Sequence, residues 1–480
     1  MEQSLPLLSQ TAEDDTQYLD IELEKASQRQ ESTSSKVIRY LLFAVSLLHS
    51  ALPRFLQIGG LNPRKDRQHS TAWLDALRGY AACVVVKFHV HEGFSHREFF
   101  HFPIIHAFEA GRGSVVIFFV ISGYVLSVRM LKMIRARNSA QLLGSLASAT
   151  FRRWLRLYAP TAFATLLLAL AMQMGWSSHE ELRQPTLYQQ LSHWVMDTIY
   201  ASDPFHNIMG WWVDPVYRTE YLFQMWTIPI EFRGSMALFL FVLACCKLST
   251  RGRMIACWML IIACYRWQVV YVACFLAGLF IADISLSYPP DQLQKLLQLP
   301  QNQLDADVTP PGRRWQWRTI AHQSGFILMF IMGLFLLSIP EDTGINGPFP
   351  FQYISRLTPS YYVKLADEYF WLSIGAILLV LALEYSPILQ APLKWSFSLY
   401  LGEISFGIYA THVLMKYTIY ENWLRPWQQN HLGDSIWADC LVGTIIFLFI
   451  FASGDYFTRV DTRIVAFGRW LQSKTFEEWE

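Results

Sequence analysis

Charged side chains are scarce in this chain. Only 16% of its 480 residues are Asp, Glu, Lys or Arg, and 53% are hydrophobic, whereas an average soluble domain carries about 25% charged residues. The formal net charge is +1, which argues against the basic surface that nucleic-acid binding requires. Because the shortage of charge falls in long apolar runs, the sequence predicts a polytopic membrane protein.

Three other features are missing from the sequence. No Asn-x-Ser/Thr site occurs, so N-glycosylation is not expected. The seven cysteines fall in or beside apolar runs, which predicts small core residues and no disulfide framework. No internal repeat is evident, although inverted repeats are typical of many secondary transporters.

Ten apolar segments are long enough to cross a bilayer. They predict an all-α fold, a polytopic transmembrane helix bundle of about ten spans. The expected spans are Ala72–Val90, Val115–Leu131, Thr150–Met174, Met225–Lys247, Arg253–Trp267, Gln268–Ser285, Ile320–Ile339, Phe370–Tyr385, Phe397–Tyr417 and Ile436–Tyr456.

The remaining regions have distinct compositions. Residues 1–36 are polar and acidic, which predicts a disordered tail without the features of a signal peptide. Residues 37–69 combine an apolar run with basic residues and a proline, and predict an interfacial or re-entrant segment. Residues 70–456 form the membrane domain, and residues 457–480 are expected to be a cytosolic C-terminal tail.

Basic residues are unevenly distributed over the connections between the spans. They concentrate in alternate connections, for example between the second and third spans and after the last. The positive-inside rule therefore places both termini in the cytosol, in agreement with an even number of spans. The outward connection Gly175–Gln224 is rich in Trp, Tyr and Pro, and two interpretations remain open for it: a lid over a site, or packing on the rim of the bundle.

The first span carries four polar groups that lipid does not tolerate: Asp75, Arg78, Lys87 and His89. Each fixed charge near the centre of a spanning helix costs roughly 2.5–3.5 kcal/mol on insertion scales. Such groups therefore face a protein interior or a wet cavity and mark a functional site. Arg78 and His89 lie on the same side of the helix, about 16 Å apart along its axis.

Five short motifs follow one another along the membrane domain. They are Leu74–Gly79 followed by His89, Phe118–Leu126, Phe151–Pro160, Trp226–Glu231 and Ser405–His412. Together and in this order they resemble the acyltransferase 3 family of integral-membrane O-acyltransferases. The Trp-rich outward connection and the acidic tail resemble its fungal branch, and residues 70–456 would be its transmembrane acyltransferase domain.

The resemblance implies an enzyme that moves an acyl group, acetyl by default, from acyl-CoA to a hydroxyl group. The acceptor would be a small molecule or a glycan, in fungal secondary metabolism. Acyl-CoA would act as a co-substrate, with no permanently bound cofactor. The expected partners are this donor, a hydroxylated acceptor and the lipid bilayer, and the endoplasmic reticulum or another endomembrane is favoured over the plasma membrane.

Three residues are the candidates for catalysis. His89 can act as a general base toward the acceptor hydroxyl, because imidazole titrates near neutral pH; the alternative is a histidine that only bonds a neighbouring helix. Arg78 can stabilise the donor or a developing oxyanion, although Asp75 is three residues away and offers a structural ion pair. Glu231 is expected at the depth of His89 and His412, where it would orient a histidine or only lock helices together.

Arg153 and Arg156 are the candidates for donor binding. They lie one helical turn apart at the expected cytosolic end of the third span, and two guanidinium groups on one face suit the phosphates of acyl-CoA. The alternative is that they only satisfy the positive-inside rule.

Supporting roles are expected for Asp75, Ser122, Tyr409 and His412. No metal site is expected, because the five-residue spacing of His91, His96, His101 and His106 fits no zinc motif. The main rival function is a transporter of an organic anion that would use the same buried charges. A non-catalytic relative of the family is a further alternative.

Overall fold

The computed structural model describes residue 49 and residues 51–61, 71–90, 99, 102–204, 219–290, 313–340, 349–363 and 366–476. The chain divides into two units, Met1–Leu61 and Asn62–Glu480. In the described part of the first unit, a 3₁₀ helix, η1, spans Arg54–Leu56. The predicted tail 1–36 and most of the predicted segment 37–69 lie outside the described residues.

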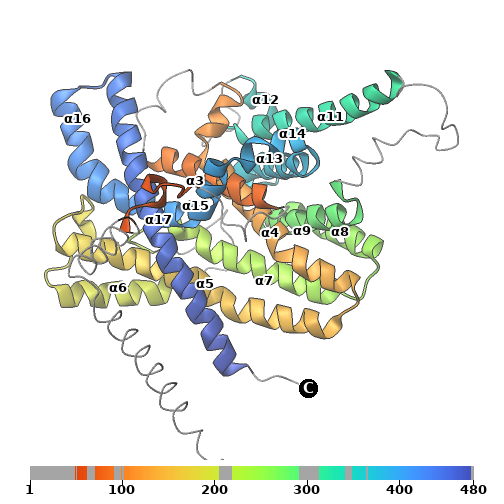
Figure 1. Ribbon diagram of the computed structural model, residues 1–480, viewed down its shortest axis with the longest axis horizontal. Helices are drawn as coiled ribbons and strands as arrows, with labels where there is room; N and C mark the ends of the chain where they lie inside the picture. Colours follow the sequence, from red (N-terminus) through yellow and green to blue (C-terminus); the bar gives the residue numbers. More distant parts are fainter. Residues whose placement is uncertain are drawn as a thin grey trace, which may run out of the picture. The chain divides into compact units, whose positions relative to one another are not determined.

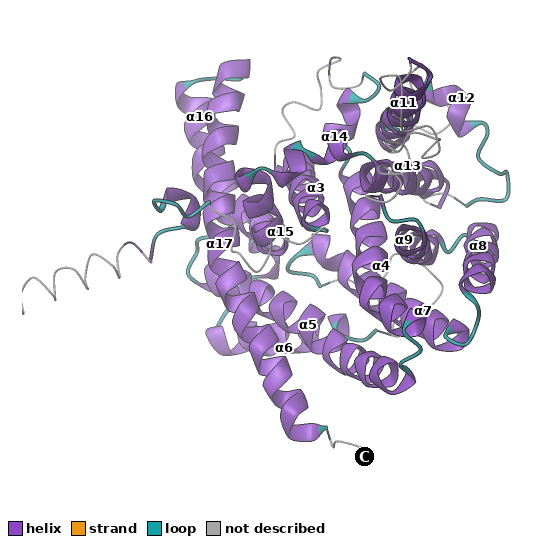
Figure 2. Ribbon diagram, turned by 45° about the vertical axis from the view of Figure 1, so that its right-hand side comes forward, coloured by secondary structure: helices purple, strands orange, loops and turns teal. Residues whose placement is uncertain are grey.

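The described part of the second unit is helical and contains no strand (Figure 2). Its longer helices are α3 Ala72–Val90, α4 Gly111–Arg135, α5 Ser139–Gln173, α6 Leu187–Ala201, α7 Thr227–Cys245, α8 Thr250–Arg266, α9 Val270–Ser287, α11 Arg313–Leu337, α13 Ala366–Tyr385, α15 Ser396–Met415 and α17 Ile436–Thr475. Short elements connect them: η5 Ile105–Phe108, η6 Glu180–Leu182, η7 Phe223–Trp226, α12 Phe351–Ser355, α14 Pro387–Gln390, η9 Pro392–Lys394, η10 Lys416–Leu424 and α16 Arg425–His431.

Each of the ten predicted spans coincides with one of these helices, and the prediction for α3 matches it at both ends. Among the described residues, six helices are long and apolar enough to cross a membrane: α4, α5, α7 together with η7, α9, α13 and α17. The all-α membrane bundle is therefore confirmed. The number of ten spans and the cytosolic termini stay predictions.

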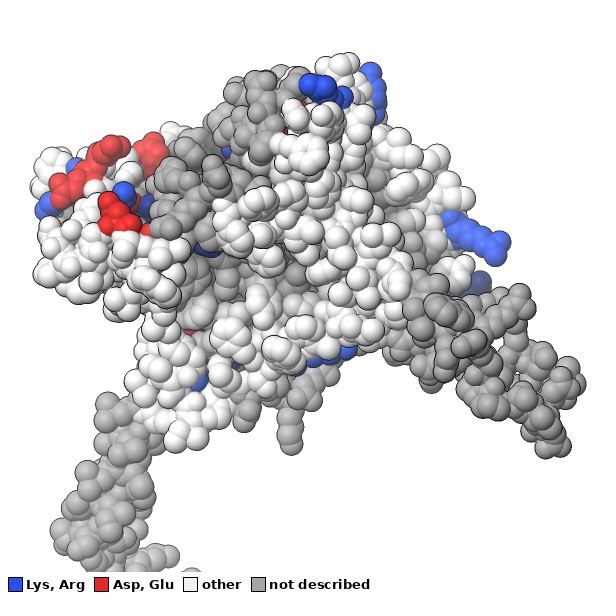
Figure 3. All heavy atoms as spheres, turned by 90° about the horizontal axis from the view of Figure 1, so that it is seen from above, with Lys and Arg blue, Asp and Glu red and all other residues white. Residues whose placement is uncertain are grey.

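The surface of the bundle fits a lipid environment. Large apolar side chains such as Leu240 of α7, Met259 of α8 and Leu448 of α17 are exposed. Figure 3 shows one face on which uncharged side chains cover most of the area, with charged side chains in a few separate groups. Exposed apolar surface on this scale is expected where acyl chains replace water.

Helices α3 and α15 lie side by side in the middle of the bundle (Figures 1 and 2). Two glycines allow this close approach. A Cβ atom on Gly79 would lie 2.5 Å from a backbone carbon of Leu401, and one on Gly402 would lie 2.5 Å from the backbone of Asp75. The contact places the Arg78 end of α3 against Leu401 and Gly402 and the other end of α3, with His89, against His412 of α15.

Helix α17 is longer than the sequence analysis expected. The predicted span ended at Tyr456 and a separate cytosolic tail began at residue 457, whereas the helix continues to Thr475. No proline interrupts residues 436–475, so nothing in the backbone chemistry ends the helix earlier. The additional turns pack against α5 and bring Asp461 and Arg469 to the site described below.

Candidate active site

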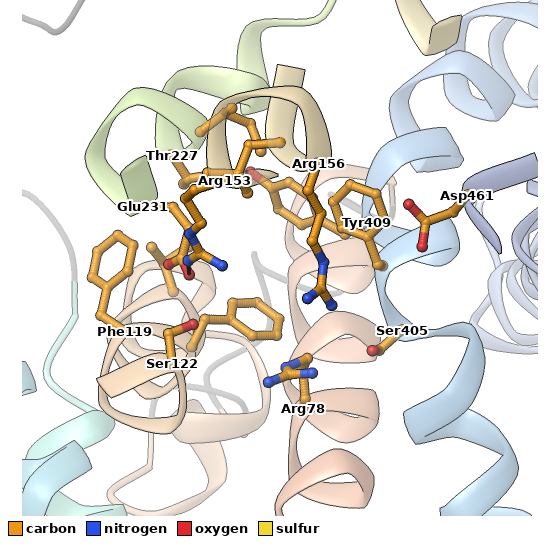
Figure 4. Close-up of a pocket in the computed structure, with 15 residues that line it drawn as sticks. Arg78, Phe119, Ser122, Arg153, Arg156, Thr227, Glu231, Ser405, Tyr409 and Asp461 are labelled. Carbon is orange, nitrogen blue, oxygen red and sulfur yellow. Dashed lines mark hydrogen bonds and ion pairs between the residues drawn. The ribbon is translucent and has the colours of Figure 1, made fainter. Parts of the chain in front are cut away.

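Six of the predicted site residues, Tyr409 among them, line one cavity of about 190 Å³ inside the bundle. Helix α3 contributes Arg78, α4 contributes Ser122, α5 contributes Arg153 and Arg156, and α7 contributes Glu231. Figure 4 shows the guanidinium groups of the three arginines directed toward a common space. We refer to this space as the arginine cavity. It is also lined by Thr227, Ser405, Tyr409 and Asp461.

Arg153 is fixed in place by two neighbours on α7. Its Nε donates to Ser235 Oγ at 2.8 Å, and its Nη2 donates to Glu231 Oε1 at 2.6 Å. Arg153 is only 8% exposed, so the carboxylate offsets a charge that would otherwise be costly to bury. Two roles were open for Glu231, orienting a histidine or forming an ion pair between helices. The structure shows an ion pair with Arg153, because this face of α7 is directed toward α5.

Arg78 and Arg156 keep most of their charge available to a ligand. Arg78 Nη1 makes a 3.3 Å contact with Asp75 Oδ1, which confirms the expected pair one turn away, but both side chains remain partly exposed. Arg156 makes no hydrogen bond or ion pair with any residue that the structure describes, although Asp461 lines the same cavity. Figure 4 shows the two guanidinium groups facing each other across open space. Two like charges in this arrangement favour a bound anion between them.

His89 and His412 form a pair on the other side of Tyr409. Their rings stack with centroids 5.5 Å apart at 23°, and Phe223 lies edge-on to His89 at 5.0 Å. Neither histidine lines the arginine cavity. The structure therefore divides the predicted site into an arginine group and a histidine group.

The geometry fixes the tautomer of His412. Its Nδ1 lies 2.8 Å from the carbonyl oxygen of Tyr409, and a carbonyl only accepts, so Nδ1 carries the hydrogen. Nε2 is then the basic nitrogen. It is buried, and it has no hydrogen-bond partner in the described part of the chain. His89 has no hydrogen bond to a described residue, so its tautomer is left open.

Tyr409 joins the two groups. It lines the arginine cavity, and its ring centroid lies 5.8 Å from that of His412. Its hydroxyl shares a hydrogen bond of 2.6 Å with Thr227 and donates to the backbone carbonyl of Gln224. Tyr409, expected only as a supporting residue, therefore stands at the boundary between the arginines and the histidines.

Several site residues were missed by the sequence analysis. Thr227 lies inside one of the motifs but was given no role. Asp461 was assigned to a tail, although the absence of any proline after Ile436 signalled a longer helix. The side-chain amide of Gln224 is buried without a hydrogen-bond partner among the described residues, and its position directly before the Trp226–Glu231 motif was the available signal.

Two further predictions concern the outward connection and the histidines after the first span. Trp194 of α6 donates through Nε1 to Thr165 Oγ1 at 3.0 Å, so this part of the outward connection packs on the rim of the bundle. His91, His96 and His101 lie outside the described residues, so the expectation that these histidines bind no metal stays a prediction.

Residues 71–455 match the Acyl_transf_3 family, an acyltransferase domain. O-acetyltransferase PaAT-1 of Phomopsis amygdali is 31% identical over 377 residues, covering 72% of this chain and 72% of the relative. Acyltransferase R4 of Phoma sp. is 23% identical over 345 residues (66% and 70%), and acyltransferase clz18 of Cochliobolus lunatus is 24% identical over 401 residues (75% and 80%). No solved structure matches the chain.

Proposed function

The chain belongs to the acyltransferase 3 family and is an integral-membrane O-acyltransferase, and on this premise we propose that it transfers an acetyl group from acetyl-CoA to a hydroxyl group of a small molecule. The acetyl group is supported by the name of the relative PaAT-1. A hydroxylated fungal metabolite as acceptor is in keeping with three fungal relatives. Family membership favours this enzyme over the organic-anion transporter.

The observation that carries the proposal is the arginine cavity. Three arginines face two carboxylates there, Glu231 and Asp461, and only Arg153 is fully engaged with one of them. Planar guanidinium groups suit phosphate and carbonyl oxygens. A cavity with positive charge to spare inside a membrane enzyme therefore fits the anionic donor of an acyl transfer better than a neutral one.

The chemistry follows from the two groups of residues. The acceptor oxygen attacks the thioester carbonyl carbon, and His89 takes the hydroxyl proton as general base. Arg78 holds the donor in the arginine cavity, because it lies about 16 Å from His89 along α3 and cannot reach the same carbonyl oxygen. The C–S bond then breaks as the ester forms, and the proton passes from His89 to the departing thiolate. The products are the acetyl ester and free coenzyme A.

We assign distinct roles to the other residues. Glu231 and Ser235 hold Arg153 at the donor, and Arg156 contacts the donor directly. Tyr409 separates the donor side from the acceptor side, so the acceptor hydroxyl binds on the side of the two histidines. His412 packs its ring against that of His89 and so helps to hold the general base in its orientation.

The donor enters from the cytosol in this proposal. Both termini and the basic connections face the cytosol, and the ten helices all span the bilayer. An endomembrane, most simply the endoplasmic reticulum, is the proposed location, since the donor and a hydroxylated metabolite are both available at its cytosolic face.

The test is an assay with purified full-length protein, acetyl-CoA and a panel of terpenoid, sterol and sugar alcohols. Release of free thiol that depends on an alcohol, together with the matching ester, supports the proposal. The His89→Ala protein, shown to be folded by its melting temperature, is the control for contaminating activity. Absence of thiol release and ester with every alcohol would contradict the proposal.

A further inference from the structure

A second and wider cavity adjoins the arginine cavity. Its volume is about 600 Å³, and it lies between α4, α5 and α17. Arg129, Arg152 and Arg469 line it, and Arg153 and Arg156 line both cavities. Among the described residues that line this second cavity, five are arginine and none is Asp or Glu. We call it the vestibule.

Three arginines of the vestibule, Arg129, Arg152 and Arg469, have no carboxylate partner among the described residues, whereas Arg153 is paired with Glu231. Arg129 and Arg469 are exposed and make no hydrogen bond or ion pair with a described residue. Arg152 donates to the hydroxyl of Ser148 at 2.9 Å, and Ser148 in turn donates to Gln472 at 3.0 Å, so α17 helps to position it. Positive charges that converge without a carboxylate repel one another, and a polyanion relieves this repulsion.

The positive-inside rule does not account for this arrangement. That rule concerns the number of basic residues in a connection, not where their side chains lie. Arg469 lies on the last turns of α17, far along the sequence from α4 and α5. It nevertheless lines the same cavity as Arg129 and Arg152. Three helices have thus brought arginines to one hollow.

We propose that the vestibule binds the phosphate-bearing nucleotide end of the coenzyme A donor. Arg153 and Arg156 then form a neck, through which the uncharged pantetheine arm reaches Arg78. This inference rests on the proposed function and changes one part of it: the phosphates lie mainly at Arg129, Arg152 and Arg469, and the neck arginines hold the region between nucleotide and thioester.

The connection between the two cavities selects this ligand. An anionic lipid headgroup would also suit the vestibule, but it would not account for the arginine cavity that adjoins it. A coenzyme A thioester has a polyanionic end, a long neutral arm and a small reacting group, in the order of the wide vestibule, the neck and the smaller inner cavity.

The experiment is a calorimetric titration of purified full-length protein with coenzyme A and with adenosine 3′,5′-bisphosphate, which carries phosphates of the nucleotide end alone. Loss of one charge-assisted contact costs roughly tenfold to a hundredfold in affinity. Arg129→Ala and Arg469→Ala should each weaken both ligands by such a factor. Arg78→Ala should weaken the bisphosphate by less than about twofold, because Arg78 lines only the inner cavity.

A control variant and a second test variant complete the experiment. Arg251 is exposed at the start of α8 and lines neither cavity, so Arg251→Ala should bind both ligands as the wild type does. Gly144 lines the vestibule with open space around its Cβ position, so Gly144→Leu adds bulk without removing charge and should also weaken both ligands. This variant decides the matter if the arginine variants do not fold.

Three outcomes would overturn the inference. The bisphosphate fails to bind the wild type, the vestibule variants bind coenzyme A normally, or coenzyme A and the bisphosphate do not compete with each other for binding. Competition by phosphatidylinositol micelles, with no bisphosphate binding, would assign the vestibule to lipid. Failure of the proposed function is distinct, because the wild type would then release no thiol from acetyl-CoA with any alcohol.

Discussion

Two clusters of arginine in this protein show opposite degrees of pairing. At the interface of α4, α8 and α9, Asp283 accepts from Arg253 at 2.8 and 2.9 Å and from Arg135 at 2.7 Å. Arg135 also bonds Ser287 and two backbone carbonyls. In the arginine cavity and the vestibule, by contrast, Arg156, Arg129 and Arg469 have no hydrogen bond or ion pair among the described residues.

The difference separates arginines that hold the fold from arginines that hold a ligand. Arg253 and Asp283 are each 1% exposed, and their charges cancel within the protein. Arg156 shares its cavity with Asp461, but no hydrogen bond or ion pair joins it to a described carboxylate. Both clusters are rich in arginine, so composition alone does not distinguish them. They differ in whether each arginine has a carboxylate partner.

The largest effect on activity is expected at His89, the proposed general base, which belongs to neither arginine cluster. His89→Ala removes the general base and should lower turnover by about two to four orders of magnitude. The melting temperature should be close to wild type, since His89 has no hydrogen bond to a described residue. Steady-state rates and thermal unfolding on the same sample check both statements, and near-normal turnover would remove His89 from the mechanism.

The largest effect on stability is expected at Asp283. Asp283→Ala leaves the buried guanidinium group of Arg253 without its carboxylate and removes one partner of the partly exposed Arg135, and breaking a buried pair in this way costs about 3–5 kcal/mol. The protein should unfold at a clearly lower temperature. The double variant Arg253→Met, Asp283→Leu should recover most of the loss, since it removes both buried charges. A wild-type melting temperature for Asp283→Ala would break the comparison on its structural side.

Arg153 lies in the second cluster but is paired like the arginines of the first, and its variants sharpen the distinction. It is buried and paired with Glu231, yet it lines the arginine cavity. Arg153→Ala should therefore lower donor affinity and stability together, each by about 1.5–3 kcal/mol for the lost charge-assisted bonds. Glu231→Gln keeps a hydrogen-bond acceptor and should lose less stability. Loss of affinity without any loss of stability would show that the ion pair is unimportant for the fold.

A smaller effect is expected from salt. Exposed charges are screened within about 10 Å at 0.1 M ionic strength and about 3 Å at 1 M. Raising potassium chloride from 0.05 to 0.5 M (roughly a threefold change in screening length) should weaken coenzyme A binding severalfold. The buried Arg253–Asp283 pair should be indifferent to it, so the melting temperature should hardly change. Equal sensitivity of both measurements would contradict the contrast between the clusters.

The mildest test concerns the side of the membrane that the vestibule faces. Ala140→Thr completes a glycosylation site at Asn138, in the connection before α5, and Leu432→Thr completes one at Asn430, after α16. Neither change touches a buried residue. The site at Asn430 should be glycosylated and the site at Asn138 should not. The opposite pattern would place the vestibule on the outward side.

The long helices could be predicted from the sequence because the apolar runs are continuous. The ends of α3 were predicted correctly, and Asp75 was found where it pairs with Arg78. The partner of Glu231 could not be foreseen, because it depends on how α7 is rotated against α5. Local spacing says nothing about such a rotation.

The extension of α17 was missed for a different reason. Hydrophobicity falls after Tyr456 while the helix continues, so a search for apolar runs ends too early. Asp461 and Arg469 were lost with it. The separation of the histidines from the arginines could be predicted, since Arg78 and His89 lie about 16 Å apart along one helix; the place of Tyr409 at their boundary could not.

The central claim is that the unpaired arginines bind the donor. It is tested most directly by titrating acetyl-CoA into purified wild type, Arg156→Ala, Arg156→Lys and Arg251→Ala, with the melting temperature of each recorded. We expect Arg156→Ala to bind roughly tenfold to a hundredfold more weakly, Arg156→Lys to be intermediate because it keeps charge but loses the planar fork, and Arg251→Ala to bind normally, all with nearly unchanged melting temperatures. Normal donor affinity in Arg156→Ala, or equal losses in Arg156→Ala and Arg251→Ala, would contradict the claim.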